Sequence, residues 1–522
     1  MRLSFAILVL VFKATLATRP TPPPRGGGLL RNRFRKPKTP APSPGSLTHV
    51  SNILDPNAHP SIAAHTNSHQ MSPTTLILNI LADLCPHGML PLSYALASSH
   101  MGGPVGGGTA AAILIMFGGL GLYSMVSIAR VVENFGSDKT KVDCSLSGAW
   151  DDVFSPGRVS ASFKHRTVGA VTCDSLCFGL TVGCCLFYSA FIADIYASLA
   201  RAFALPGILS KRWAILVALS TIVVMPLCLL EDLAALQTSS MVGLSGIVFT
   251  VGVVIKRAFD GSYTPKGTFF PSMAAPLQAA IPPSPLRPLI SLGKSSTSAT
   301  TNFATVCCVA FACHYNSVKY YMELESRSVK KFTATMAKGF GATAAVFLSM
   351  MIFGYLTFGQ NSQALLLNNY GAGDVLATLA RFLTGIAILS GYPLMFAGLK
   401  SSGFSLFKIT TKSAGSSKRR KLSVKRKQVV FSVGVLAIIT LMACFITEED
   451  LGLVIGVVGA VMGSSVVYII PAILNVRVLG RGRKNLQFFR GERKCNFLLG
   501  AFGVGLAIVG TKVNMASGGN HH

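Results

Sequence analysis

Residues 75–98 read TLILNILADLCPHGMLPLSYALAS, a segment long enough to cross a bilayer and apolar except near its centre. The centre holds polar or helix-breaking residues in close succession: Asp83, Cys85, Pro86, His87 and Gly88. Pro86 removes a helical hydrogen bond, and Gly88 permits backbone conformations that other residues avoid. Irregular backbone at this depth occurs only where it is buried in protein or lines a watery cavity. The segment therefore predicts a membrane-spanning helix that is interrupted at a solute-binding site.

The rest of the chain repeats such apolar segments. Half of the 522 residues are hydrophobic and only 13% are charged, which leaves too little polar surface to coat a soluble globule of this size. We predict an all-α integral membrane protein of about eleven transmembrane helices, each near the length that crosses a hydrocarbon core. The predicted spans are residues 75–98, 109–131, 167–198, 213–230, 239–255, 304–320, 334–358, 375–396, 429–446, 453–473 and 497–513.

The basic residues lie between these spans. A formal net charge of +28 raises the alternative of a nucleic-acid-binding protein, but such a protein would gather its Lys and Arg on one soluble face. Here they concentrate in the connection 400–427 and after the tenth span, whereas the connections 98–108, 359–373 and 447–452 contain none. We therefore expect membrane lipid and no nucleic acid as partner, with the basic connections facing the cytosol or its topological equivalent.

The amino-terminal part of the chain carries targeting signals. Residues 1–17 have the charged start, short apolar core and small residues of a secretory signal. Residues 18–72 are rich in Pro, Ser and Arg, which predicts a disordered segment or a transit peptide, and the two stretches together resemble a bipartite presequence for secondary plastids. We expect an endomembrane or organelle membrane, the plastid envelope included, or the plasma membrane. A cleaved secretory signal would leave the new amino terminus outside, against the loop charges.

A Pro- and Ser-rich connection, residues 259–298, divides the spans into two halves, and each half begins with an irregular span. The second irregular span carries four polar or polarisable residues in a row, namely Cys313, His314, Tyr315 and Asn316. Paired broken helices are typical of carriers that bind their solute at mid-membrane. A half-helix beginning after Pro86 would present N–H groups that suit a carboxylate. The alternative is a proline kink without a ligand.

Asp83 is the ionisable residue of greatest interest, because a charge inside a span is costly. Its carboxylate can bind a cation, carry a proton with His87 as relay partner, or hold a substrate amine. The alternative is that Asp83 caps the half-helix after the break. For His314, the alternative to a coupling role is a structural hydrogen bond. The 12 cysteines lie mostly within spans and are expected to be free, and no metal-ligand spacing stands out.

Several motifs, in order along the chain, resemble those of the amino acid/auxin permease family, which includes sodium-coupled neutral amino acid transporters and vacuolar amino acid carriers. The residues 311–314 (FACH) and 321–324 (YMEL) are similar to its F-x-C-H and Y-x-E-L elements, and 353–358 (FGYLTF) and 365–370 (LLLNNY) resemble its seventh span and following loop. The resemblance implies a LeuT-type 5+5 inverted repeat with broken helices 1 and 6, which moves amino acids by alternating access.

The resemblance also implies a site. The substrate carboxylate would meet the backbone at Pro86 to Gly88, and the amino group would meet carbonyls around Ala82, Asp83 and Phe311. The expected substrate-binding residues are Ala82, Asp83, Cys85, Pro86, His87, Gly88, Phe311, Cys313, His314 and Asn316, and the expected ion-coupling residues are Asp83, His87 and Ser390.

The chain departs from the family where sodium would bind. The family's usual Asn is Ala82 here, and the Thr often found two residues before the proline of the eighth span is Gly391, beside Ser390. We therefore predict a secondary active amino acid transporter in which proton coupling is favoured over sodium coupling. The alternative is an amino acid sensor that keeps the carrier fold. An enzyme is not expected, because neither a Ser/Cys–His–Asp pattern nor a metal cluster is present. No cofactor is expected. The transporter domain is predicted at residues 73–515, followed by a tail at 516–522. The sequence does not predict which amino acids are transported or the oligomeric state.

Overall fold

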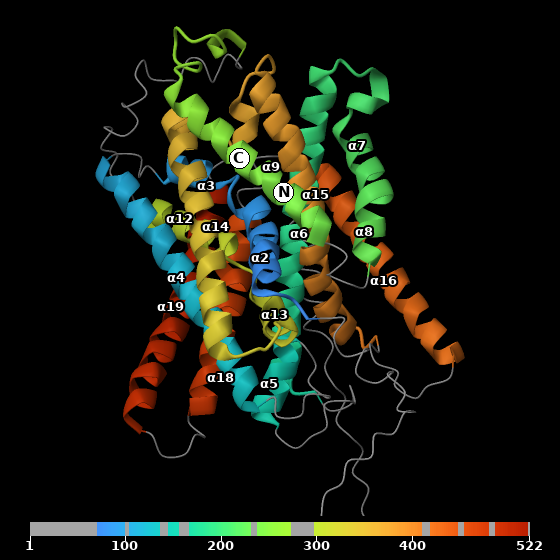
Figure 1. Cartoon of the computed structure of the whole chain (residues 1–522), viewed down its shortest axis with the longest axis vertical. Coiled ribbons are helices and arrows are strands. Elements are labelled where there is room, and N and C mark those ends of the chain that lie inside the picture. Colours follow the sequence, from blue (N-terminus) through green and yellow to red (C-terminus); the bar gives the residue numbers. More distant parts are fainter. Residues whose placement is uncertain are drawn as a thin grey trace, which may run out of the picture. The chain divides into compact units, whose positions relative to one another are not determined.

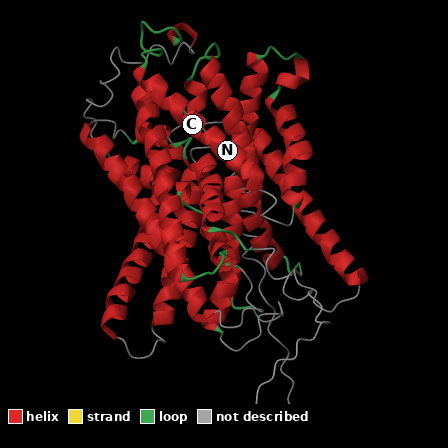
Figure 2. Cartoon of the chain, viewed as in Figure 1, coloured by secondary structure: helices red, strands yellow, loops and turns green. Residues whose placement is uncertain are grey.

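A computed structural model describes residues 70–99, 104–135, 145–155, 166–230, 237–272, 297–409, 418–446, 454–479 and 486–519. The predicted signal and most of the predicted disordered segment lie outside these residues. The described part is helical, with one isolated bridge between Met71 and Leu324 (Figure 2). The prediction of an all-α multi-pass membrane protein is confirmed.

Nine helical segments of the described chain are long and apolar enough to cross a membrane. They are α4 (Pro104–Phe135), α6 (Val168–Ala202), α7 (Arg212–Leu219) continuing through η3 (Ser220–Val224) into α8 (Met225–Leu229), α9 (Gln237–Phe259), α14 (Val329–Phe358), α15 (Val375–Leu406), α16 (Lys418–Phe445), the run of η9 (Val458–Gly463), η10 (Ser465–Ile469) and α18 (Ile470–Leu479), and α19 (Leu486–Gly519). The last of these extends into the tail predicted from residue 516.

The first predicted span is a broken pair. Helix α2 (Pro73–Gly88) and helix α3 (Leu92–Ser98) are bent by 41° and together make a tenth span. The break falls after Gly88 and not at Pro86, which lies inside the last turn of α2. Because proline has no N–H, Pro86 cannot donate to the carbonyl of Ala82 four residues earlier, and the helix ends within one turn after it.

The sixth predicted span is also broken. Helix α12 (Thr297–Ala310) ends before the FACH motif, and the single turn η6 (His314–Asn316) and the short helix α13 (Ser317–Glu323) follow. Neither helix is long enough to span alone. The described residues therefore hold nine or ten candidate spans where about eleven were predicted, and the helix is interrupted within the first and the sixth predicted span.

Helices α6 and α15 form the buried centre, where they pack against each other, and α9 packs along α15 (Figure 1). Helix α14 packs against α4 and α2. Helices α7, α16 and α19 are the most exposed spans, and apolar side chains such as Ile222, Ile438 and Ile508 cover their outer faces. Those faces fit lipid, because apolar residues need no burial in protein when the solvent is hydrocarbon.

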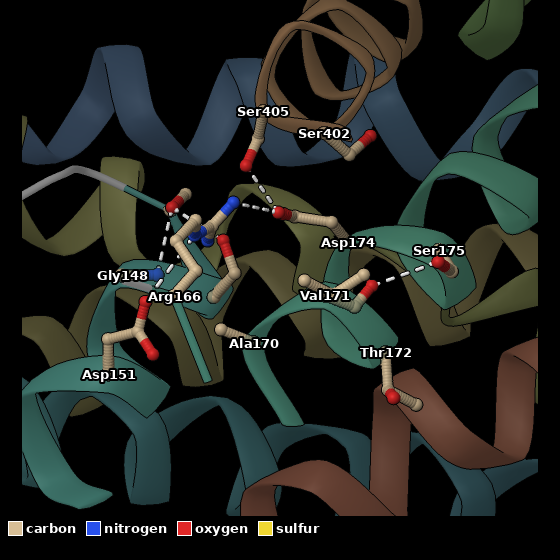
Figure 3. A network of polar contacts seen from close by, with 12 residues as sticks. Gly148, Asp151, Arg166, Ala170, Val171, Thr172, Asp174, Ser175, Ser402 and Ser405 are labelled. Atoms are coloured by element: carbon tan, nitrogen blue, oxygen red, sulfur yellow. Dashed lines mark hydrogen bonds and ion pairs between the residues drawn. The ribbon is translucent and has the colours of Figure 1, made fainter. Parts of the chain in front are cut away.

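A short helix that the sequence did not reveal, α5 (Leu146–Phe154), comes between α4 and α6 in the chain and is held to α6 by a polar network (Figure 3). Asp151 of α5 accepts hydrogen bonds from the Thr167 backbone N–H (3.1 Å) and hydroxyl (2.6 Å) at the start of α6. Arg166 donates to Asp151 at 3.4 Å and to Asp174 of α6 at 2.5 Å. The Ser405 hydroxyl at the end of α15 also donates to Asp174. This network holds α5, α6 and α15 together.

Candidate functional site at the two broken spans

Asp83 lies in α2 with no exposed surface, and its carboxylate is held by the sixth span. The Tyr315 hydroxyl donates to Oδ1 at 2.7 Å, and the Tyr320 hydroxyl donates to Oδ2 at 2.8 Å. Asn316 Nδ2 lies 3.5 Å from Oδ2. A buried carboxylate is costly without such partners, so this cluster stabilises the charge and at the same time ties the first broken span to the sixth.

Two of the predicted roles of Asp83 can be compared with this geometry. The capping role does not fit, because Asp83 lies within α2 and the cap position of α3 is Pro91, which makes no side-chain capping bond. The predicted proton relay between Asp83 and His87 has no direct counterpart in the hydrogen bonds of His87. His87 contacts Tyr188 of α6, and Tyr188 contacts the backbone carbonyl of Asp83 and not its carboxylate.

The hydrogen-bonded series from Val309 through His87 and Tyr188 to the Asp83 carbonyl determines how many protons the His87 imidazole must carry. Its Nε2 lies 3.2 Å from the Val309 carbonyl, which can only accept, so Nε2 carries a proton. Its Nδ1 lies 3.2 Å from the Tyr188 hydroxyl, which donates to the Asp83 carbonyl at 3.1 Å. One hydroxyl hydrogen cannot serve both contacts. All three contacts are hydrogen bonds only when Nδ1 is also protonated, and with a neutral His87 the chain is one hydrogen short.

The two positions that depart from the family at the sodium site meet in space. A Cβ atom added to Gly391 of α15 would lie 2.6 Å from the Ala82 carbonyl oxygen and 3.4 Å from the Pro86 side chain. Neither Ala82 nor Gly391 offers a side-chain oxygen. Ser390 is buried and lies against Gly243 of α9. The site is therefore close-packed at this point, with backbone oxygen from α2 facing α15.

The other predicted residues form an apolar side of the same region. Phe311 is fully buried, packs parallel to Phe340 with ring centroids 6.0 Å apart, and meets the Phe347 ring at 5.1 Å. The Phe347 ring lies directly against Gly88, where a Cβ would come within 2.2 Å of it. Cys85 and Cys313 are fully buried and free. Aromatic side chains of the sixth span and α14 thus cover the end of α2.

His314 stands apart from the Asp83 cluster. Its Nε2 donates to the Gly121 carbonyl of α4 at 3.0 Å, which is the structural hydrogen bond predicted as its alternative role. Its Nδ1 is buried and has no partner among the described residues. The residues that the sequence predicted together are therefore divided between an acidic cluster at Asp83 and a second polar position at His314.

Sequence reasoning missed Tyr188 and Tyr320 as site residues. Both are fully buried tyrosines whose hydroxyls reach α2 from other helices. A tyrosine buried in a bilayer needs a partner for its hydroxyl, so a tyrosine inside an apolar span is the signal that could have found Tyr188. Across the described ranges, no group of three or more His, Cys, Asp and Glu side chains is arranged to hold a metal ion.

Comparisons with known proteins agree on one family. The family model described as transmembrane amino acid transporter protein matches residues 69–515, most of the chain. Sodium-coupled neutral amino acid transporter 7 of Xenopus laevis is 21% identical over 360 residues, which cover 66% of this chain and 71% of that protein. Putative sodium-coupled neutral amino acid transporter 11 of Homo sapiens is 24% identical over 271 residues, 49% of this chain and 55% of that protein.

Two solved structures of other transporters match the chain over most of their length. MhsT in complex with L-phenylalanine is 13% identical, with a TM-score of 0.49 over 86% of this chain and 98% of that chain. Mhp1, a nucleobase-cation-symport-1 family transporter in a closed conformation, is 12% identical, with a TM-score of 0.45 over 88% of this chain and 94% of that chain.

Proposed function

Because the chain belongs to the family of transmembrane amino acid transporter proteins, we propose that it is a secondary active carrier which moves amino acids by alternating access and is coupled to protons in preference to sodium. Family membership establishes that the chain is an integral membrane protein that transports amino acids and is not an enzyme. The coupling ion and the residues at the site are the proposal.

The Asp83 cluster carries the proposal of proton coupling. As an ion, the carboxylate accepts from Tyr315 and Tyr320, which belong to the other broken span. Proton binding would remove the negative charge, and the hydrogen bonds from the two tyrosines to a neutral carboxyl group would be weaker than those to the carboxylate. Protonation of Asp83 therefore weakens the link between the first and sixth spans, the two elements that must rearrange when a carrier changes the side it faces.

His87 supports the same proposal from the other side of α2. Its chain of contacts to Tyr188 and the Asp83 carbonyl is complete only with a second proton on the imidazole. A proton at His87 thus tightens α2 against α6, while a proton at Asp83 loosens α2 from the sixth span. Protonation of one residue together with deprotonation of the other would therefore shift α2 from one neighbour to the other.

Sodium coupling finds less support in the geometry. Sodium needs several oxygen ligands, and the two family positions that would supply side-chain oxygens are Ala82 and Gly391. A Cβ added to Gly391 would lie 2.6 Å from the Ala82 carbonyl oxygen. At these two positions, that carbonyl is the oxygen that could bind a sodium ion. Ser390 is the neighbouring hydroxyl that remains as a proposed coupling residue.

We place the substrate at the two breaks. The last helical hydrogen bond of α2 runs from the Met89 N–H to the Cys85 carbonyl. The backbone N–H groups that follow Met89 are therefore proposed to bind the substrate carboxylate. This position is about one turn later than the predicted one at Pro86. Phe311 and Gly88 border this position. The remaining predicted residues, Cys313, His314 and Asn316, complete the proposed site at the second break. The membrane is proposed to be an endomembrane or organelle membrane, the plastid envelope included, or the plasma membrane.

Uptake of each of the twenty amino acids into proteoliposomes, with a pH gradient or a sodium gradient imposed, tests the proposal. We expect accumulation driven by the pH gradient and little effect of sodium, with protein-free liposomes as control. Binding of an amino acid without flux under any gradient would overturn the carrier and favour the sensor. Accumulation that requires sodium at every pH would overturn proton coupling and leave the carrier standing.

A further inference from the structure

Helix α14 runs along the first broken span and packs against both of its helices (Figure 1). On one side of the break, a Cβ added to Gly339 would lie 3.1 Å from the Ile80 side chain of α2. On the other side, a Cβ added to Gly354 would lie 2.3 Å from the Ser93 hydroxyl oxygen of α3, and that hydroxyl donates to the Met350 carbonyl at 2.7 Å. Glycine thus lets α14 approach both halves of the broken span closely.

Between these two contacts, at the level of the break, α14 presents the side chain of Phe347. The three outermost atoms of its ring lie 2.2, 2.8 and 3.0 Å from the position that a Cβ of Gly88 would occupy. Both residues are buried, and Phe347 has no exposed surface. The ring therefore fills the space directly beside the end of α2, and anything larger than a hydrogen atom there would have to move it.

The Phe347 ring is itself confined. Its centroid lies 5.1 Å from that of Phe311, which is fully buried and packs in turn against Phe340. The far edge of the Phe311 ring would lie 3.0 Å from a Cβ added to Gly118 of α4. In a close-packed interior a ring can move only if its neighbours move with it. Phe347 is therefore held in place beside the break.

The neighbours on the other sides of α2 contact it differently. Gly391 of α15 lies directly against its backbone, and Tyr188 of α6 presents a hydroxyl group to His87. Phe347 instead presents an apolar ring at Gly88, the residue before Met89. An amino acid whose carboxylate binds the backbone after Met89, as proposed above, therefore has its side chain within reach of this ring.

We infer that Phe347 is a specificity-determining residue, which restricts the carrier to amino acids with small side chains such as glycine, alanine and serine. The inference rests on the proposed position of the substrate at the first break. Side chains of no more than two heavy atoms need little displacement of the ring, whereas the side chain of leucine or phenylalanine would overlap with it. Because Phe347 acts through the volume it occupies, a smaller residue at this position enlarges the range of substrates.

Binding of amino acids to the purified full-length protein in detergent, measured by isothermal titration calorimetry, tests the inference. We expect the wild-type protein to bind alanine at least about tenfold more tightly than leucine, since a pocket discriminates by about that factor for each methylene group it cannot accommodate. Phe347→Ala should bring the two affinities within about threefold of each other, through tighter binding of leucine and not through weaker binding of alanine.

Phe332→Ala is the matched control. Phe332 is also a fully buried phenylalanine of α14, but it lies about 22 Å along the helix from Phe347 and packs against Tyr321, with ring centroids 5.4 Å apart. It should keep the wild-type preference for alanine. If Phe347→Ala does not fold, Phe347→Leu removes less volume and should still reduce the preference severalfold.

Wild-type affinities that are equal for alanine and leucine would overturn the inference. So would a folded Phe347→Ala protein that keeps the wild-type preference or binds neither amino acid. Failure of the transport proposal gives a different result: size-dependent binding without flux would contradict the carrier and leave the role of Phe347 standing. A wild-type protein that binds no amino acid at all would overturn both.

Discussion

Asp83 and its partners come from distant parts of the chain. Tyr315 and Tyr320 lie 232 and 237 residues beyond it, and Tyr188 lies 105 residues beyond it. The sequence identified Asp83, because a carboxylate in an apolar segment stands out by itself. It could not identify Tyr320, since a tyrosine near a span end is common and only the packing of α13 beside α2 makes it a partner. The sequence thus predicted the charged residue of the site, Asp83, but not the tyrosine hydroxyls that donate hydrogen bonds to it.

Asp83→Asn should abolish pH-dependent uptake and leave expression intact. The amide is nearly the same size and still accepts from one tyrosine, but it neither takes up nor releases a proton in the working pH range. Uptake in proteoliposomes at acidic and neutral pH measures the effect, and we expect the difference between the two to fall by at least about tenfold. Glu325→Gln is the control, because Glu325 is an exposed carboxylate that pairs only weakly with Lys331. A variant that keeps the wild-type pH profile would remove Asp83 from the coupling mechanism.

Gly391→Ala should lower both stability and uptake. The new Cβ would lie 2.6 Å from the Ala82 carbonyl oxygen, a backbone atom that can move only if α2 and α15 separate. Overpacking of this kind costs about 1–3 kcal/mol. Thermal unfolding in detergent measures it. Gly119→Ala in α4 is the matched control, since a Cβ there meets nothing within 4 Å and should be tolerated. Equal melting temperatures for the two variants would contradict the close contact between α2 and α15.

At the level of elements, the local pattern predicted most boundaries and missed one helix. The eighth span was predicted to begin at residue 375, and α15 begins at Val375, where Asp374 provides the helix cap by accepting from the Ala377 N–H. Helix α5 lies in the segment between the predicted spans 109–131 and 167–198, for which no helix was predicted. Its apolar residues Leu146, Trp150 and Val153 recur at helical spacing after the capping residue Ser145, and this signal would have found it.

Arg166→Gln should destabilise the protein through the junction of α5, α6 and α15 shown in Figure 3. It leaves Asp151 and Asp174 without the guanidinium that compensates their charge, and both side chains are about nine-tenths buried or more. Removing one partner of a buried ion pair costs about 3 kcal/mol or more, which should lower the melting temperature in detergent by several degrees.

Lys256→Gln is the matched control for this prediction. Lys256 also pairs with an aspartate, Asp260, but its side chain is 56% exposed and Arg257 remains to neutralise the carboxylate. Such exposed pairs contribute little, so the melting temperature should stay near that of wild type. An Arg166 variant as stable as the Lys256 variant would show that the network does not hold the three helices together.

At the level of the whole molecule, Gln70–His522 form one compact unit. The start of this unit is joined to the sixth span: the Met71 N–H donates to the Glu323 carbonyl at 2.7 Å, and the Glu325 N–H donates to the Met71 carbonyl at 3.0 Å. Ser72 then caps α2 by accepting from the Thr75 N–H. These contacts connect the entry of the first broken span to the exit of the second.

Two deletions test where the folded unit begins. A chain that starts at Gln70 should melt at the temperature of the full-length protein, because it keeps every contact of Met71 and Ser72. A chain that starts at Thr75 loses two backbone hydrogen bonds and the cap, about 3 kcal/mol in total. Its melting temperature should be several degrees lower. Equal stability of the two shortened chains would show that the contacts of Met71 and Ser72 contribute nothing.

The sequence by itself determined that this chain is a multi-pass membrane protein, that its first and sixth spans are irregular, and that Asp83 is the charged residue at the break. These are local properties, because transfer of a segment into a bilayer depends on its own composition and a buried charge is costly whatever its neighbours. The tertiary structure alone decided that α2 continues past Pro86, that tyrosines from the three elements α6, η6 and α13 donate to oxygens of Asp83, and that Ala82 faces Gly391. Those features depend on which helices pack side by side, and no local pattern records that choice.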